Sequence, residues 1–218
     1  TWATTIKWVK DGGGNAGGEF DFYGGYKGTA GAIGYDFGIL TYQYPDHSLA
    51  ISPNTTEIYG AGTYGPVTLK YSHATTNLFG FADSKNSYYL DLSAFFDLGD
   101  GWSLTPHIGY QKVKNSSASS YTDYALTLGK DFGGGLSASI WLEAGVNNDN
   151  GTGVASNVNN AANGGASPTG TQGLTFNRRS TVSLAGSWGE LRLGRDFVPA
   201  FWNVGIFDPF GTQGVGAN

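Results

Sequence analysis

The chain has 218 residues and a net charge of −5; glycine and aromatic residues are abundant, and only 13% of the residues are charged. The acidic balance argues against a nucleic-acid partner, and the absence of cysteine excludes disulfides, thiolate metal sites and cysteine nucleophiles. No run of about 18 apolar residues occurs, so we expect no membrane-spanning helix. The length fits a single all-β domain over residues 1–218.

Alternation of polar and apolar residues predicts a chain made almost entirely of strands, with little helix. Most predicted strands have the about 9–11 residues that a tilted strand needs to cross a bilayer. In the clearest case, Leu90, Leu92 and Ile108 share one parity, whereas Asp91 and His107 share the other. In chain order the predicted strands cover residues 2–10, 19–27, 32–44, 55–64, 67–75, 87–98, 102–114, 121–132, 136–147, 174–187 and 190–198.

The connections between these strands alternate between short and long. Short glycine-rich turns are predicted at residues 28–31, 65–66, 99–101, 133–135 and 188–189, and longer polar loops lie between them. In an antiparallel meander this places the turns at one rim and the loops at the other, as in outer-membrane barrels. The sequence therefore predicts an up-and-down transmembrane β-barrel of about 12 strands, with the last strand supplied by the C-terminal segment.

A soluble fold is the alternative, because a period of two also occurs in β-sandwiches and in lipocalin-like barrels whose apolar face points inward. Aromatic residues near the predicted strand ends, such as Trp2, Tyr35 and Trp102, fit the interfacial girdles of a membrane barrel but also a core. Pro106 lies in the middle of a predicted strand, where its missing N–H predicts a bulge or local irregularity.

Two pieces of the chain resemble known families. Residues 2–133, with "GYDFGILTYQYP" and "SYYLDLSAFFDLGDGWSLTPHIGYQKV", resemble the Gcw_chp family of proteobacterial predicted outer-membrane proteins, for which no activity is established. Residues 134–218, with "FNRRSTVSLAGSWGELRLGRD", are similar to early strands and the third loop of trimeric general porins from β-proteobacteria. Both resemblances imply a barrel in the bacterial outer membrane, and the second implies a homotrimer.

The porin resemblance also implies a constriction. Parity directs Arg179 and Arg192 away from the apolar face, and porins of this type line one wall of the constriction with arginine and fold the third loop against it. A transverse field between arginine and carboxylate would then sort ions by charge. The alternative is that these are ordinary lumen or rim charges in mutual salt bridges. The candidate pore-lining residues are Arg178, Arg179, Arg192, Arg195 and Asp208.

We therefore expect a porin-like channel in the outer membrane for passive diffusion of ions and small hydrophilic solutes. The alternatives are a non-conducting barrel with a structural or surface-binding role, and a soluble barrel that binds an apolar ligand. No catalytic motif spacing occurs, and His47, His73 and His107 are isolated in sequence, so we expect neither an enzyme nor a metal site nor a cofactor. The expected partners are the lipid bilayer and the permeating solutes.

Overall fold

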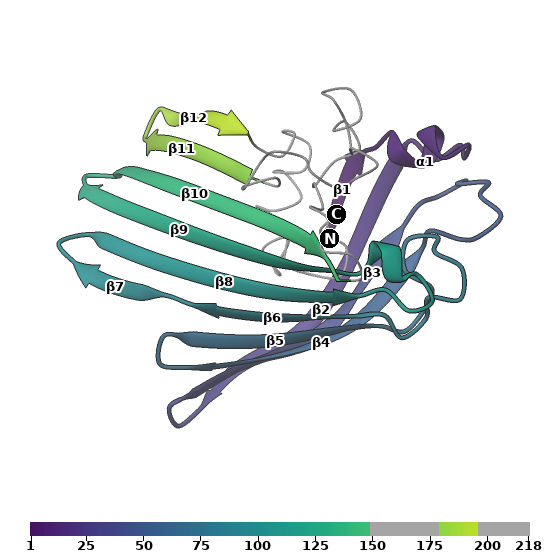
Figure 1. Cartoon of the computed structure of the whole chain (residues 1–218), viewed down its shortest axis with the longest axis horizontal. Helices are drawn as coiled ribbons and strands as arrows, with labels where there is room; N and C mark the ends of the chain where they lie inside the picture. Colours follow the sequence, from purple (N-terminus) through teal and green to yellow (C-terminus); the bar gives the residue numbers. More distant parts are fainter. Residues whose placement is uncertain (149–178, 196–218) are drawn as a thin grey trace.

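The computed structural model describes residues 1–148 and 179–195, which form one antiparallel sheet (Figure 1). The strands follow chain order across the sheet, and β7 pairs with β8 beside β6. The all-β antiparallel meander predicted from the sequence is confirmed. The strands are β1 (Trp2–Thr5), β2 (Gly18–Ala30), β3 (Ile33–Gln43), β4 (Thr55–Tyr64), β5 (Val67–Ala74), β6 (Tyr88–Ala94), β7 (Phe96–Gly99), β8 (Trp102–Lys112), β9 (Tyr121–Gly133), β10 (Leu136–Asn147), β11 (Arg179–Gly186) and β12 (Gly189–Arg195).

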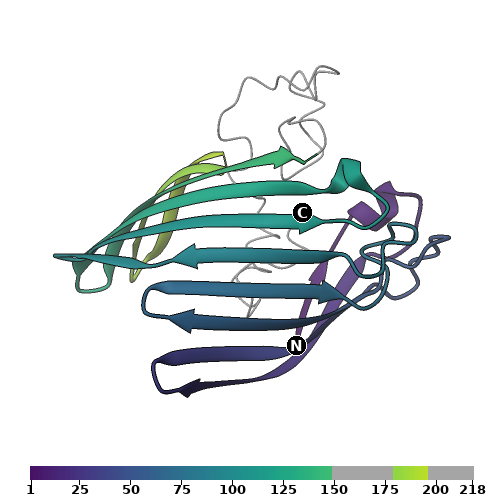
Figure 2. The same cartoon turned by 60° about the horizontal axis from the view of Figure 1, so that its bottom comes forward.

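The two rims of the sheet differ as predicted. Tight hairpins join β2 to β3, β4 to β5, β7 to β8, β9 to β10 and β11 to β12 at one end, which we call the turn end. The longer connections within the described residues, which join β1 to β2, β3 to β4, β5 to β6 and β8 to β9, lie at the opposite, loop end (Figure 2). In the β9–β10 turn, Gly133, Gly134 and Gly135 all have positive φ, a conformation that other residues adopt only with strain.

Burial across the sheet is inverted relative to a soluble protein. On β2, Glu19 and Asp21 are 9% and 6% exposed, whereas Phe20 and Phe22 on the opposite parity are 42% and 49% exposed. We call the face with buried polar side chains the inner face and the face with exposed apolar side chains the outer face. All twelve described strands belong to one sheet, so no second sheet covers the outer face in the described residues. An apolar surface of this extent fits contact with lipid.

The first strand is shorter than predicted. Instead of continuing to residue 10, β1 ends at Thr5, and a single helical turn, α1 (Trp8–Asp11), follows. The reason is tertiary packing: Val9 is fully buried in a cluster with Leu40 and Tyr44, and the Trp8 ring meets the Tyr44 ring edge-on at 5.0 Å. No helix in the described parts of the chain is long and apolar enough to span a membrane.

The irregularity expected at Pro106 appears on one side only. The register between β8 and β9 continues through Pro106, which lies opposite Leu126. On the other side, pairing stops after Ser93 and resumes at Phe96, which divides the predicted strand 87–98 into β6 and β7. This division brings the described strands to twelve, whereas the C-terminal segment expected to supply the twelfth lies outside the described residues.

Candidate functional site

A compact group of polar side chains lies on the inner face where β6, β8 and β9 run side by side. On β8, His107 Nε2 is 2.7 Å from Asp91 Oδ2 of β6, and Nδ1 is 3.4 Å from Asp123 Oδ1 of β9. The Tyr89 hydroxyl donates to both carboxylate oxygens of Asp123, at 3.2 and 3.1 Å. The histidine and both aspartates are at most 7% exposed at the side chain. Hydrogen bonds to carboxylates are strong when they are buried away from water, so this group holds the three strands together.

A glycine makes room for this group. Gly109 lies opposite both Asp91 and Asp123 in the two registers of β8. A Cβ at Gly109 would come within 1.8 Å of the Tyr89 hydroxyl oxygen and 2.6 Å of Asp123 Oδ2. The hydroxyl end of Tyr89 therefore lies against the β8 backbone at Gly109, a close approach that only glycine allows.

The same arrangement recurs on β4 and extends the polar row toward the N-terminal strands. Tyr59 lies over Gly38, where a Cβ would meet its ring carbon Cε1 at 2.7 Å, and its hydroxyl donates to Asp36 Oδ1 at 3.0 Å. Lys70 Nζ lies 5.4 Å from the centroid of the Tyr59 ring, and Lys70 is directly opposite Asp91 in register. A polar belt thus crosses the inner face from β3 to β9 and comprises Asp36, Tyr59, Lys70, Tyr89, Asp91, His107 and Asp123.

The buried inner face carries more acidic than basic side chains in the described residues. Toward the loop end, burial together with the charge of Glu19 raises the pKa of Tyr44 well above its ordinary value. The tyrosine therefore stays protonated beside the acidic residues. The buried acidic residues are Glu19, Asp21, Glu57, Asp91, Asp123 and Glu143, and the buried basic residues are Lys70 and Arg179.

At the loop end the inner side is packed with apolar side chains. One buried cluster contains Val9, Leu40 and Tyr44, and a second contains Leu78 and Tyr89. Phe79 touches both clusters, and its ring lies 5.0 Å from that of Tyr42. The loops therefore fold inward over the end of the sheet and are anchored there by aromatic contacts.

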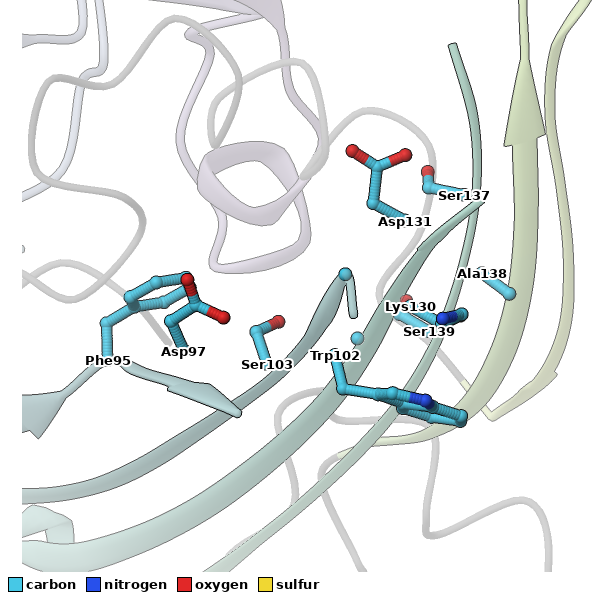
Figure 3. A pocket seen from close by; sticks show the side chains of 11 residues that line it. Phe95, Asp97, Trp102, Ser103, Lys130, Asp131, Ser137, Ala138 and Ser139 are labelled. Atoms are coloured by element: carbon cyan, nitrogen blue, oxygen red, sulfur yellow. The ribbon is translucent and has the colours of Figure 1, made fainter. Parts of the chain in front are cut away.

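The turn end, in contrast, is hollowed. A cavity of about 530 Å³ lies over β2 to β6 and is lined by polar residues that include Asp36, Lys70 and Ser93. A second, of about 400 Å³, lies over β7 to β10. In Figure 3, Asp97 and Ser103 extend to one side of the sheet into this second cavity, whereas the Trp102 ring is directed to the other side. The inner face is thus filled near the loops and open near the turns.

Of the five candidate pore-lining residues, the structure describes the side chains of Arg179 and Arg192. Arg179 on β11 is buried on the inner face, with its guanidinium carbon 3.6 Å from the centroid of the Trp141 ring and Glu143 opposite it in register. Arg192 on β12 is partly exposed and forms an ion pair of 2.6 Å with Glu190. The backbone of Arg195 ends β12. The side chain of Arg195, and all of Arg178 and Asp208, lie outside the described residues.

Sequence reasoning placed His107 and Asp91 on the inner parity but missed their assembly with Asp123 and Tyr89. The sequence does show that Asp123 has inner parity in its strand. It does not show the register between the strands, which is needed to place Asp123 and Tyr89 beside Asp91 and His107. No group of three or more histidine or acidic residues that could hold a metal ion occurs in residues 1–148 and 179–195.

Comparison with known proteins agrees with this architecture. The family model described as "Bacterial protein of unknown function (Gcw_chp)" matches residues 1–164. The chain is also 33% identical to outer membrane porin protein 32 of Delftia acidovorans over 149 residues, which cover 66% of this chain and 32% of the porin. The chain therefore spans about a third of the length of that relative. No solved structure matches.

Both matches reach further than the pieces recognised in the sequence. The family model continues past residue 133, and the stretch aligned with the porin is longer than the segment 134–218. These matches and the exposed apolar outer face identify a β-sheet protein of the bacterial outer membrane. The chain belongs to the Gcw_chp family of bacterial proteins.

Proposed function

We propose that the protein is an outer-membrane channel for passive diffusion of ions and small hydrophilic solutes. The observation that carries this proposal is the inverted sheet, with an apolar outer face and a polar inner face hollowed to about 530 Å³ at the turn end. A polar, charged wall that encloses water supports permeation of hydrophilic solutes and selects among them by charge.

A channel in lipid also needs a closed wall. In the described residues β1 and β12 are the two edges of the sheet and do not pair with each other. Open backbone edges cannot face hydrocarbon, because each unpaired N–H and C=O costs several kcal/mol there. We therefore propose that residues 1–218 contribute to a single closed barrel.

Conductance of the full-length protein in planar lipid bilayers tests this function. The expected result is stepwise ionic current after insertion of the purified, refolded protein, with no current from detergent alone. Correctly inserted protein that seals the bilayer without any current steps would refute the channel.

We propose that Arg179 and Arg192, together with Arg178, Arg195 and Asp208, set the charge preference of the passage. Removing positive charge from the wall lowers the local concentration of anions, so Arg179→Gln and Arg192→Gln should each shift the reversal potential toward cation preference. The measurement is the reversal potential in a salt gradient. Lys130→Gln, at a position that contacts Trp102 at the turn end, is the matched control for loss of one positive charge. Unchanged reversal potentials in both arginine variants would contradict this role.

The second candidate is a non-conducting outer-membrane barrel with a structural or surface-binding role. It is favoured by the loop end, where Val9, Tyr44 and Leu78 are almost fully buried. A wall whose polar groups are joined across strands also resembles the filled interior of a narrow barrel. The bilayer recordings separate the two candidates, because a sealed barrel gives no current steps.

A further inference from the structure

The outer face of β5, β6 and β8 is graded from apolar to aromatic to basic toward the loop end. The strand registers align Leu69, Leu92 and Ile108 in one row across the three strands. The next row toward the loops contains Tyr71 and Tyr110, with Leu90 between them.

The last row before the loops is His73, Tyr88 and Lys112. The rings of Tyr71 and Tyr88 are 5.7 Å apart, and those of Tyr88 and Tyr110 are 6.1 Å apart. This order matches the passage from acyl chains to headgroups, where tyrosine marks the membrane–water boundary.

The loops above this surface add two more lysines in fixed positions. Lys85 and Lys114 are exposed, and their backbone N–H groups donate to Asn77 Oδ1 at 3.1 Å and to Ser87 Oγ at 3.0 Å. Asn115 joins the two loops through a bond from Nδ2 to the carbonyl of Asp83 at 2.9 Å. Lys85 and Lys114 therefore lie on loops whose backbone is held in place by hydrogen bonds.

The charge of this surface opposes that of the chain as a whole. Loops 75–87 and 113–120 contain a single carboxylate, Asp83, against Lys85, Lys114 and the adjoining Lys112, whereas the chain has a net charge of −5. His73 lies between two polar partners, with Nε2 3.2 Å from Asn86 Oδ1 and Nδ1 2.9 Å from the Tyr71 hydroxyl oxygen. The basic character comes from the three lysines.

We propose that Lys85, Lys112 and Lys114 bind the phosphate groups of an anionic membrane lipid whose acyl chains lie along Leu69, Leu92 and Ile108. Lysines just outside the hydrocarbon region attract anionic headgroups, and each contributes about fivefold to binding, the equivalent of about 1 kcal/mol. The row with Tyr71 and Tyr110 separates Lys112 from the apolar row, as the interfacial layer separates headgroups from acyl chains. This site is independent of whether the barrel conducts.

Native mass spectrometry of the full-length protein in nonionic detergent tests the proposal by counting retained phosphatidylglycerol against phosphatidylcholine. The variant K85A/K112A/K114A is expected to bind phosphatidylglycerol about a hundredfold more weakly, since three fivefold contributions are lost, with phosphatidylcholine binding unchanged. The matched control K7A/K10A/K27A removes the same charge from exposed lysines elsewhere and should bind like the parent.

Equal weakening in both triple variants would overturn the site, because it would indicate unspecific attraction. Displacement of the lipid by inorganic phosphate alone would also overturn it, since the site would then take a free anion. If the triple variant does not refold, the single variants Lys85→Ala and Lys114→Ala carry the test, each with about fivefold weaker binding expected.

Discussion

Replacing Leu92 with arginine is expected to destabilise the protein in a lipid bilayer by about 2–4 kcal/mol. Leu92 lies on the outer face of β6, is 43% exposed, and stands between Leu69 and Ile108 on the neighbouring strands. Its row is separated from the loop end by two rows that contain tyrosines, which places it well inside the apolar band. An arginine there must desolvate its charge or distort the bilayer to reach water.

The neighbouring residue provides the control. Ser93 points to the opposite face and lines the 530 Å³ cavity together with Lys70 and Asp91. Ser93→Arg should change the stability by less than about 1 kcal/mol, because its guanidinium enters a polar space beside a carboxylate. The free energy of unfolding by denaturant in lipid vesicles measures both variants. The opposite order, with arginine tolerated at position 92 and costly at 93, would mean that the apolar face is a protein core.

The architecture was predictable because it depends on local and repeating features. Alternation such as Asp21 beside Phe22 assigns each strand residue to a face, and turns such as Gly133–Gly135 mark where the chain reverses. Period-two patterns alone did not decide which face meets lipid. The alternation of short and long connections supplied that information, because it is typical of membrane barrels.

Features that depend on contacts between distant residues were not predictable. Trp8 and Val9 continue the alternation of the first strand in the sequence. In the structure they lie in the helical turn α1, because Val9 packs on Leu40 and Tyr44. Likewise, Asp91, His107 and Asp123 meet only once the register of three strands is known. The arginine candidates rest on a resemblance, and the structure places Arg179 in a buried stack with Trp141.

The inner group around His107 depends on Gly109, and Gly109→Ala is expected to destabilise the protein by about 2–4 kcal/mol. The added Cβ would lie 1.8 Å from the Tyr89 hydroxyl oxygen and 2.5 Å from its ring carbon Cζ, so the whole ring must move. Moving it removes two hydrogen bonds from the buried Asp123 carboxylate. The expected loss of stability therefore has two causes: overpacking around the added Cβ, and a buried Asp123 carboxylate that has lost hydrogen bonds.

A matched glycine and a double-mutant cycle separate this clash from a general effect of alanine in a strand. At Gly60 on β4, an added Cβ would have no atom within 4 Å, so Gly60→Ala should leave the unfolding free energy nearly unchanged. In a Tyr89→Ser background the space over Gly109 is free, and Gly109→Ala should then cost at least about 1.5 kcal/mol less than in the parent. If Gly109→Ala lowers the unfolding free energy equally in both backgrounds, Tyr89 does not occupy the space over Gly109. In that case Tyr89 would not be the group that fixes Asp123 beside His107.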